Sequence, residues 1–463
     1  MTDNAIQGKN LHRLVKLIMD SGEATSIEEA QQTLARYRLG IFVGNGVVDS
    51  PAYQAALLTA VNTSRRCFLG GVLVTGNLDV PLLVPWKRCS TLAEAIIDLQ
   101  GQITSEIDYG LPGIFFGDET PTIDNGQFSV RPIIHGWNGG VVPVCDLVPF
   151  LPGEKFTPSG VLAGALAVSE AFQDIRGDNP LAGHRSIGFS LWQPDINNES
   201  WLNADSGPLL TSLPAKLWLI GLGHLGQAYL WTLGFLPYPM ESDVKVVLQD
   251  FDALEDANDS TSLLTNKTLV GKMKTRAMAA WCEERGFQVT IVERKFMGDF
   301  RIQDTEPALA LCGVDNIEAR RDLEKVGFQR IIEAGLGKGT QEYLGLKVHT
   351  FPASRIAEQC WAQKAGIEKD NPIECLIQQP AYQNLYKKGL DHCGLIELAG
   401  HSVGASFVGA VASTLVISQT LRIVRGENIY ELIDADLRSS SVLSCVVPNR
   451  ANLGLFNPGL IHI

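Results

Sequence analysis

The sequence lacks several features that would place it in a special class of protein. Its nine cysteines form no CxxC pair and have no regular spacing, which argues against a structural zinc site and against a disulfide framework. The first twenty residues mix charged and polar side chains and lack the apolar core of a signal peptide. The apolar runs predict no membrane-spanning helix. We therefore expect a cytoplasmic protein with free thiols.

An excess of positive charge is also missing. The chain has 38 basic and 51 acidic residues, which gives a net charge of -13. Such a surface repels phosphate backbones and anionic lipids, so we expect neither nucleic-acid nor membrane binding. The hydrophobic fraction of 45% and the charged fraction of 19% are typical of a globular protein. A chain of 463 residues is long enough for about two or three domains.

Each half of the chain opens with an apolar strand that runs into glycine, at 41–46 and at 216–223. Each half also contains a long helix rich in small residues, at 159–176 and 405–423, and the segment LVISQTL of the second aligns without gaps on LAVSEAF of the first. The alternation of strands and helices predicts an α/β fold with two doubly wound, mainly parallel sheets. We interpret the similarity as a weak internal duplication, although packed helices often share small residues.

A stretch rich in Asn, Asp, Ser and Pro at 193–214 is typical of a linker between domains. The predicted domains are therefore 1–205, which begins with polar helices, and 206–463. After the fourth strand of the second domain the chain runs for about 60 residues without a strong sheet pattern. This stretch predicts a cysteine-bearing insertion at about 350–400.

Gly221, Gly223 and Gly226 form a GxGxxG motif directly after a predicted strand and at the start of a helix. Glycine is needed there because a phosphate must approach the backbone and the amides of the helix N-terminus. Asp250 and Asp252 end the next strand as QDFD, where a carboxylate can accept hydrogen bonds from ribose hydroxyls. These features suit NAD and ATP equally, so a NAD-dependent oxidoreductase is an alternative.

The motifs that follow are more specific. Asn258 comes after QDFD, Lys274 ends the segment VGKMK, and Asp315 and Asn316 end a third strand as VDN. The order of these motifs over 216–340 resembles the ubiquitin-activating (ThiF/MoeB-like adenylyltransferase) superfamily, which includes the bacterial enzymes that activate sulfur-carrier proteins. The resemblance implies two Rossmann-like ThiF-type domains that form a pseudo-dimer.

The resemblance also implies roles for these residues in ATP binding. Asp252 would hold the ribose with Asn258 beside it, Lys274 would contact the triphosphate, and Asp315 would bind Mg²⁺ with Asn316 next to it. Attack of a carboxylate on the α-phosphorus builds negative charge on phosphate oxygens, which a fixed lysine and a magnesium ion neutralise. Taken singly, a surface lysine and an aspartate at a strand end are both common.

One position departs from the superfamily pattern. The superfamily carries an Arg-Gln pair where this chain has Thr261 and Ser262. A positive charge near the phosphates is therefore missing from this segment. Related enzymes take an arginine from the partner half of a dimer, and Arg36 or Arg38, just before the first strand, is the candidate here.

A reactive thiol is expected in the second half. Cys393 precedes a glycine-rich loop that leads into the small-residue helix, and in the superfamily a cysteine before such a loop can take the acyl group. The neighbouring His392 or a helix terminus could favour the thiolate, which is the nucleophile. Cys375 and Cys360 lie in the same insertion and are alternatives, whereas Cys312 lies inside an apolar strand and is expected in the core.

The first half lacks the motifs of the second, because its glycine turn reads GNGVVDS and neither DFD nor VGxxK follows. It resembles the inactive adenylation half of eukaryotic ubiquitin-activating enzymes. The compact length suggests the bacterial relatives encoded in ubiquitin-like antiviral (Bil-type) operons.

The resemblance implies an enzyme that adenylates the C-terminal carboxylate of a ubiquitin-like protein with ATP and Mg²⁺. It would then form a thioester on a cysteine and transfer the acyl group to a ubiquitin-conjugating-type enzyme. Alternatives are activation of a sulfur-carrier protein, activation of a peptide, and a binding module with an inactive nucleotide site.

Overall fold

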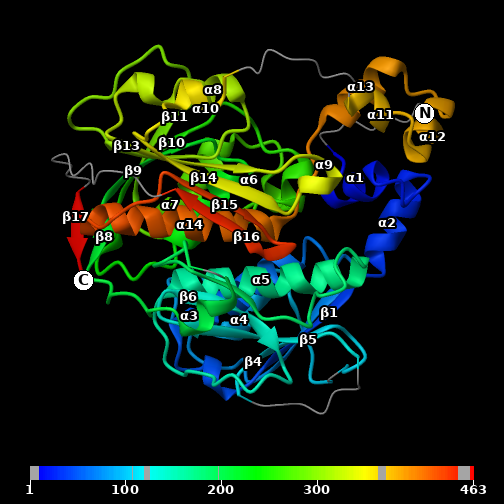
Figure 1. Ribbon diagram of the computed structural model, residues 1–463, viewed down its shortest axis with the longest axis horizontal. Helices are drawn as coiled ribbons and strands as arrows, with labels where there is room; N and C mark the ends of the chain where they lie inside the picture. The colour runs from blue at the N-terminus through cyan, green and yellow to red at the C-terminus, as the bar shows by residue number, and fades with distance from the viewer. Residues whose placement is uncertain (1–9, 107, 119–125, 197, 363–371, 447–458) are drawn as a thin grey trace.

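A computed structural model describes residues 10–106, 108–118, 126–196, 198–362, 372–446 and 459–463. Two sheets, one from each half of the chain, lie on either side of a central layer of helices (Figure 1). Residues 1–9 of the first predicted domain and residues 363–371 of the predicted insertion lie outside the described residues.

The N-terminal half forms a seven-stranded sheet. Its strands from β3 to β5 are parallel, and β6 and β7 add to it in antiparallel fashion. In sheet order the strands are β3 (Gln102–Ile103), β2 (Gly71–Gly76), β1 (Arg38–Val43), β4 (Gly113–Phe116), β5 (Ser129–His135), β6 (Asn138–Pro143) and β7 (Ile187–Ser190). Most of their residues are buried, as expected for strands covered on both faces.

The C-terminal half forms an eight-stranded sheet whose strands from β11 to β13 are parallel and whose remaining strands are antiparallel. In sheet order the strands are β11 (Gln288–Val292), β10 (Lys245–Gln249), β9 (Lys216–Ile220), β12 (Leu309–Cys312), β13 (Arg330–Leu336), β14 (Gly345–Phe351), β15 (Leu432–Asp436) and β16 (Ser439–Val446). A separate ribbon pairs β8 (Ser212–Pro214) with β17 (Leu460–His462). The predicted α/β fold with two mainly parallel sheets is therefore confirmed.

The helices cover the two sheets and fill the space between them. The described α-helices are α1 (Arg13–Asp20), α2 (Ile27–Ala35), α3 (Pro51–Ser64), α4 (Leu92–Asp98), α5 (Thr157–Arg176), α6 (His224–Leu233), α7 (Lys274–Glu284), α8 (Ile317–Arg321), α9 (Gly339–Glu342), α10 (Ala357–Cys360), α11 (Pro372–Leu376), α12 (Pro380–Lys387), α13 (His392–Gly400) and α14 (Ser406–Arg425). Helices α11 to α13 gather beside α1 and α2 at one edge of the molecule (Figure 1).

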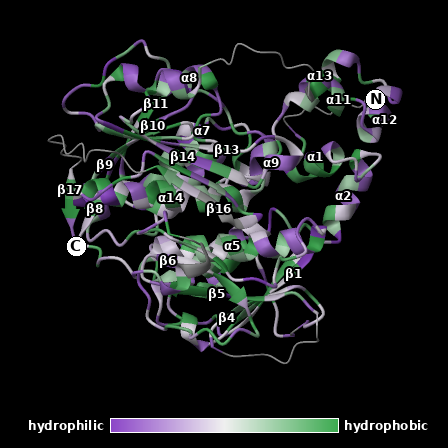
Figure 2. Ribbon diagram, in the orientation of Figure 1, coloured by the Kyte–Doolittle hydropathy of each residue, from purple (hydrophilic) through white to green (hydrophobic). Residues whose placement is uncertain are grey.

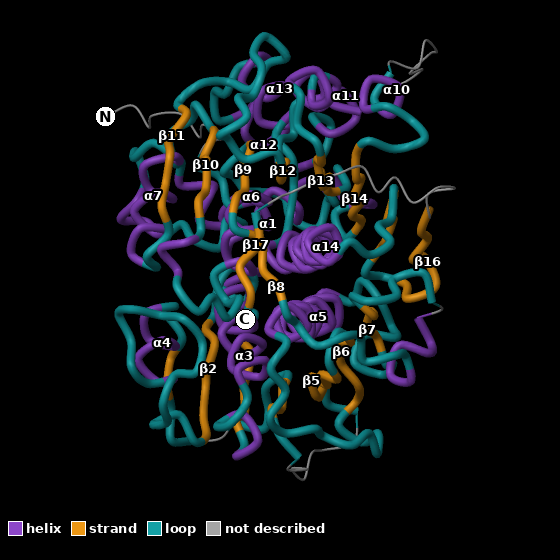
Figure 3. Tube along the Cα trace, turned by 90° about the vertical axis from the view of Figure 1, so that its left-hand side faces the viewer, coloured by secondary structure: helices purple, strands orange, loops and turns teal. Residues whose placement is uncertain are grey.

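The two longest helices, α5 and α14, pack against each other at the centre of the molecule. Figure 3 shows both end-on, between the two sheets. Each has 20 residues and ends at a glycine with a left-handed backbone, Gly177 at φ 70° and Gly426 at φ 71°. The gapless alignment of LVISQTL on LAVSEAF also aligns both ends of these helices. The first seven strands of the second sheet repeat the order of the first sheet, which supports an internal duplication.

The expectation that no helix could cross a membrane needs correction for α14. Ser406–Arg425 is long enough, and its mean hydropathy of 1.6 is high enough, to span a bilayer by length and composition. However, 94% of that segment is buried inside the protein. Its apolar surface packs against α5, α6 and the second sheet, within the hydrophobic centre visible in Figure 2. The helix has the burial of a core helix.

The sequence missed several strands. Strand β14 lies in the stretch that was predicted to lack a sheet pattern, and β6, β11, β15 and β16 were not predicted either. In β14 and β15 buried residues alternate with partly exposed ones, and in β11 no residue is fully buried. Strands β11, β14 and β15 thus have the weaker apolar signal of strands that are not buried on both faces, whereas β6 is fully buried but begins with Asn and two glycines. The described remainder of the insertion is helical, from α10 to α13.

Candidate active site

A cavity of about 510 Å³ lies where β9, β10 and β12 end. Ligands of open α/β sheets bind at the carboxyl ends of the parallel strands, so this is the expected place for a nucleotide. The cavity is lined by the glycine turn after β9 and by parts of the segments 249–261, 313–316 and 401–404. Arg13, from the N-terminal half, lines it as well.

The three glycines of the predicted turn differ in why a side chain is absent there. Gly221 has φ +82°, and a Cβ atom on Gly226 would lie 1.9 Å from the carbonyl oxygen of Gly221. By contrast, a Cβ atom on Gly223 would meet nothing within 4 Å. Gly221 and Gly226 are therefore required by backbone conformation and packing. Gly223 leaves open space at the N-terminus of α6, where backbone amides can bind a phosphate.

Asp250 holds the glycine turn in place. Its Oδ2 atom accepts a hydrogen bond from the Leu222 amide at 2.6 Å, and its Oδ1 atom accepts bonds from the amides of Phe251 and Asp252 at 2.7 and 2.9 Å. These three bonds use much of the carboxylate's hydrogen-bonding capacity, so the geometry favours a structural role. Direct contact of Asp250 with a nucleotide stays a prediction.

The structure brings Asp252, Lys274 and Asn258 together on the cavity wall. The Nζ atom of Lys274 lies 3.0 Å from Oδ2 of Asp252, and the backbone amide of Lys274 donates to the Asp252 carbonyl at 2.9 Å. The side chain of Lys274 is 12% exposed and that of Asp252 is 48% exposed. The Oδ1 atom of Asn258 accepts a hydrogen bond from the amide of Glu255 at 2.8 Å. An ammonium group and a carboxylate thus meet beside the glycine turn.

Asp315 and Asn316 follow β12 and also line the cavity. The Oδ1 atom of Asn316 accepts a hydrogen bond from the amide of Ala319 at 3.0 Å and so caps α8. Asp315 is exposed and makes no hydrogen bond to another described residue. Within the described parts of the chain no three His, Cys, Asp or Glu side chains converge as a metal site. Nucleotide-bound Mg²⁺ needs only one or two carboxylates besides phosphates, so Asp315 fits the predicted role.

Neither arginine that was predicted to reach the phosphates lines the cavity. Arg36 is exposed after α2, and Arg38 begins β1 with its guanidinium 3.9 Å from Asp108. Arg36 precedes β1 and Arg38 is its first residue, so both lie at the amino ends of the first sheet's parallel strands. Arg13, the first residue of α1, lines the cavity together with Thr261, so the structure favours Arg13 over Arg36 and Arg38 as the arginine near the phosphates.

Three polar atoms around the cavity are buried and have no hydrogen-bond partner among the described residues. They are Nη1 of Arg13, Nε2 of His224 and Nε2 of His401. Burial lowers the pKa of His224 to about 4, and burial is also the main cause that lowers the pKa of His401. Both rings are therefore neutral at physiological pH. Unpaired buried polar groups are rare in native proteins, and a polar ligand in the cavity would offer partners to such atoms on its wall.

The sequence missed Arg13, His224 and His401, and it also missed three further basic residues on the cavity wall, Lys295, Arg320 and Lys338. Lys295 follows β11, a strand that was not predicted. Arg13 is far from the glycine turn along the chain, and nothing in its local sequence marks it.

The predicted thiols lie outside the described wall of the cavity. Cys393 is exposed in the first turn of α13, directly after the exposed His392. Helix α13 places about 12 Å of helix length between Cys393 and the loop that begins at His401. Cys393 therefore does not lie next to that glycine-rich loop, as its place in the sequence had suggested. Cys375 is exposed in α11, and burial raises the pKa of the partly buried Cys360.

Cys312 is buried in β12, as predicted for a core residue. Burial raises the pKa of its thiol to about 12, so it stays a neutral thiol.

In the N-terminal half the corresponding turn after β1 is filled by an aromatic ring. A Cβ atom on Gly46 would lie 2.2 Å from a ring carbon of Phe150. That ring stacks on Tyr53 with 4.4 Å between the ring centroids. The space that is open at Gly223 is thus occupied by protein at Gly46.

Comparison with known proteins gives two consecutive family matches. The family described as the BilD N-terminal domain matches residues 38–191, and the family described as the BilD C-terminal domain matches residues 213–427. A bacterial E1-like protein BilD from Collimonas sp. (strain OK412) is 41% identical over 424 residues, which cover 91% of this chain and 90% of the relative.

Solved structures are more distant. Escherichia coli MccB is 14% identical, with a TM-score of 0.34, over 70% of this chain and 93% of that chain. The E. coli tRNA N6-threonylcarbamoyladenosine dehydratase TcdA in complex with AMP is 14% identical, with a TM-score of 0.26, over 45% of this chain and 85% of that chain.

Proposed function

Because the chain belongs to the BilD family of bacterial E1-like proteins, we propose that it adenylates the C-terminal carboxylate of a ubiquitin-like protein with ATP. Membership in an E1-like family favours an adenylyltransferase over the NAD-dependent oxidoreductase that the glycine turn alone would also allow. The observation that carries the proposal is the arrangement of Lys274, Asp315 and Arg13 around the open space at Gly223.

In this proposal the nucleotide binds with its ribose near Asp252 and Asn258 and its phosphates near Gly223. An oxygen of the partner's carboxylate attacks the α-phosphorus, the bond to the bridging oxygen breaks, and pyrophosphate leaves. An acyl adenylate of the partner remains. Lys274 and Arg13 stabilise the negative charge that develops on the phosphate oxygens. Mg²⁺, when bound at Asp315, would neutralise further charge on the phosphates.

A second step would transfer the acyl group to a thiol of the chain. The thiolate attacks the acyl carbonyl carbon, a thioester forms, and AMP leaves. Cys393 is our first candidate because it is exposed at the start of a helix, where a thiolate is stabilised, and Cys375 and Cys360 are alternatives. A ubiquitin-conjugating-type enzyme would then accept the acyl group. A cytoplasmic location and a role in antiviral defence stay predictions.

ATP–pyrophosphate exchange tests the first step. The chain is incubated with ATP, labelled pyrophosphate, Mg²⁺ and a ubiquitin-like protein that ends in glycine. We expect exchange only when this partner is present. Lys274→Ala should lower the exchange rate by at least about 100-fold, because the loss of one fixed charge at a developing oxyanion typically costs that much.

Lys272→Ala is the matched control, since Lys272 lies in the same segment but is exposed and does not line the cavity. It should keep the rate within about twofold of the unmodified chain. Equal rates for Lys274→Ala and Lys272→Ala, or no exchange with such partners, would contradict the proposal.

A further inference from the structure

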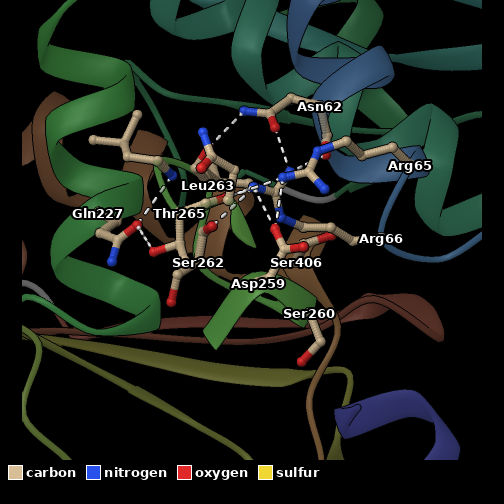
Figure 4. A network of polar contacts seen from close by, with 12 residues as sticks. Asn62, Arg65, Arg66, Gln227, Asp259, Ser260, Ser262, Leu263, Thr265 and Ser406 are labelled. Atoms are coloured by element: carbon tan, nitrogen blue, oxygen red, sulfur yellow. Dashed lines mark hydrogen bonds and ion pairs between the residues drawn. The ribbon is translucent and has the colours of Figure 1, made fainter. Parts of the chain in front are cut away.

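Two arginines of the N-terminal half reach into the C-terminal half (Figure 4). Arg66, 1% exposed, donates through Nη2 to the carbonyl oxygens of Ser262 and Thr265 at 2.9 and 3.0 Å. Arg65 donates through Nη2 to the same Thr265 carbonyl at 3.0 Å and lies 2.8 Å from Oδ1 of Asp259. The segment 259–265 is therefore held by two guanidinium groups from the other half.

This segment is the one that departs from the superfamily pattern. It carries the acidic Asp259 and the uncharged Thr261 and Ser262, and the basic groups come instead from Arg65 and Arg66, which follow α3 of the other half. Thr261 lines the cavity, whereas the carbonyl of Ser262 accepts from Arg66. The segment thus connects the buried arginines to the wall of the nucleotide site.

The start of α1 rests on the same segment. The backbone amide of Arg13 donates to Oγ of Ser260 at 3.2 Å. His12 precedes it and caps α1 by accepting a hydrogen bond from the amide of Leu14 at 3.2 Å. Burial lowers the pKa of His12 to about 4, Asp259 opposes this, and Arg66 adds to it, so these groups lie within electrostatic reach of one another. A shift of residues 259–260 would therefore move Arg13.

A further contact ties the segment to the glycine turn. The Oε1 atom of Gln227 accepts from the amide of Leu264 and from Oγ1 of Thr265, both at 3.0 Å. The Nε2 atom of Gln227 donates to the carbonyl of Leu222 in the glycine turn at 3.0 Å. The phosphate-binding turn and Arg13 are thus attached to one segment.

We propose that Arg66, together with Arg65 and Asp259, is a positioning residue for adenylation, which holds residues 259–265 so that Arg13 faces the phosphates of ATP. This inference rests on the proposed function, because it assigns Arg13 to the nucleotide. A planar guanidinium that bridges two carbonyl oxygens fixes their positions more closely than a flexible ammonium can. Replacing it should therefore misplace Arg13.

Binding of two nucleotides separates positioning from general stability. AMP and α,β-methylene-ATP, which lacks the scissile α–β oxygen, are titrated with Mg²⁺ by calorimetry into the full chain. Arg13→Ala should lower the affinity for α,β-methylene-ATP about tenfold more than the affinity for AMP. This is the loss expected for one charge-assisted hydrogen bond. Arg66→Lys should give a similar change. In the double variant the two changes should not add, because Arg66 acts through Arg13.

Thr59→Val is the control for a general weakening of the interface. It removes another buried hydrogen bond between the halves, from Nε1 of Trp231 to Oγ1 of Thr59 at 2.9 Å. It should lower the melting temperature and leave the ratio of the two affinities unchanged. If Arg66→Lys does not fold, Asp259→Asn removes the ion pair with little change in volume and should shift the ratio in the same direction, by about threefold.

Two results would overturn the positioning role. One is an affinity for AMP and an affinity for α,β-methylene-ATP that fall equally, or do not fall at all. This applies to whichever variant folds, Arg66→Lys or Asp259→Asn. The other is full additivity of that variant with Arg13→Ala. Failure of the proposed function has a different signature, in which the unmodified chain binds neither nucleotide or Arg13→Ala binds both as tightly as the unmodified chain.

Discussion

The two halves of the chain share one strand order but differ where their first parallel strand ends. After β9 the turn is open at Gly223, and Asp252 and Lys274 lie beside it. After β1 the ring of Phe150 fills the space at Gly46. A nucleotide site in this fold therefore depends on a few side chains at one sheet edge, which one half can lose while its sheet persists.

The N-terminal half instead contributes positive charge to the other half. Arg13 reaches the cavity wall, and Arg65 and Arg66 hold the segment 259–265. Under the proposed function the two halves would divide the work, with one half providing the phosphate-binding turn and the other providing basic side chains. Each of the following changes tests one difference between the halves, beginning with the largest expected effect.

The connection before the long central helix differs most between the halves. It runs over 144–156 before α5 but over 352–405 before α14, where it includes Cys375 and Cys393. We expect Cys393→Ala to abolish a dithiothreitol-sensitive adduct between the chain and its ubiquitin-like partner on non-reducing gels. ATP–pyrophosphate exchange should continue, because adenylation precedes the thiol step.

The exposed Cys145 in the shorter connection offers a matched control. Cys145→Ala should leave both the adduct and exchange intact. Loss of the adduct in Cys375→Ala but not in Cys393→Ala would move the acyl site to α11.

The two glycine turns can be compared directly. Gly223→Ala places a methyl group in open space, so the free protein should keep its melting temperature. A methyl group that intrudes on a bound phosphate should weaken nucleotide binding by about 10- to 100-fold, from an overpacking cost of about 1–3 kcal/mol.

Gly46→Ala should show the reverse pattern. Its methyl group meets the ring of Phe150, so the melting temperature should fall by a few degrees, about what 1 kcal/mol causes. Nucleotide affinity should not change. Weaker nucleotide binding in Gly46→Ala than in Gly223→Ala would contradict the assignment of the active half.

One histidine from each half gives an effect on stability that is seen only at acid pH. Burial lowers the pKa values of His12 and His224 from 6.5 to about 4. Between pH 6.5 and about pH 4 the two histidines bind protons in the unfolded chain but stay neutral in the folded chain. Their contribution to stability is therefore complete above pH 6.5 and is lost as the pH falls toward 4. The loss is at most about 3 kcal/mol per histidine.

Melting temperatures measured from pH 7 to pH 4.5 test this prediction. His12→Asn keeps a residue that can cap α1 but does not titrate, so its melting temperature should fall less steeply with acid than that of the unmodified chain. Parallel curves for the two proteins would show that His12 does not titrate on unfolding in this range.

The parts that the sequence predicted well are local. The strand that ends in GxGxxG and the acids after β10 are contiguous motifs, and their geometry follows from the strand and the turn. The acids after β10 could also be expected to lie near the glycine turn after β9, because β9 and β10 are adjacent parallel strands.

The parts that the sequence missed depend on packing between distant segments. Arg13 reaches the cavity because α1 rests on Ser260, a contact between residues 247 positions apart. Arg66 follows the end of α3, and nothing in its local sequence indicates that it is buried against the other half. No periodicity or motif encodes such contacts, so Arg36 and Arg38 were as plausible as Arg13.

The most direct test of the central claim is a crystal structure of the chain with α,β-methylene-ATP and Mg²⁺. The account predicts that the triphosphate passes the open turn at Gly223, with Nζ of Lys274 and the guanidinium of Arg13 within hydrogen-bonding distance of phosphate oxygens. A nucleotide bound in the N-terminal half, or one bound with Lys274 and Arg13 both turned away from it, would contradict the account.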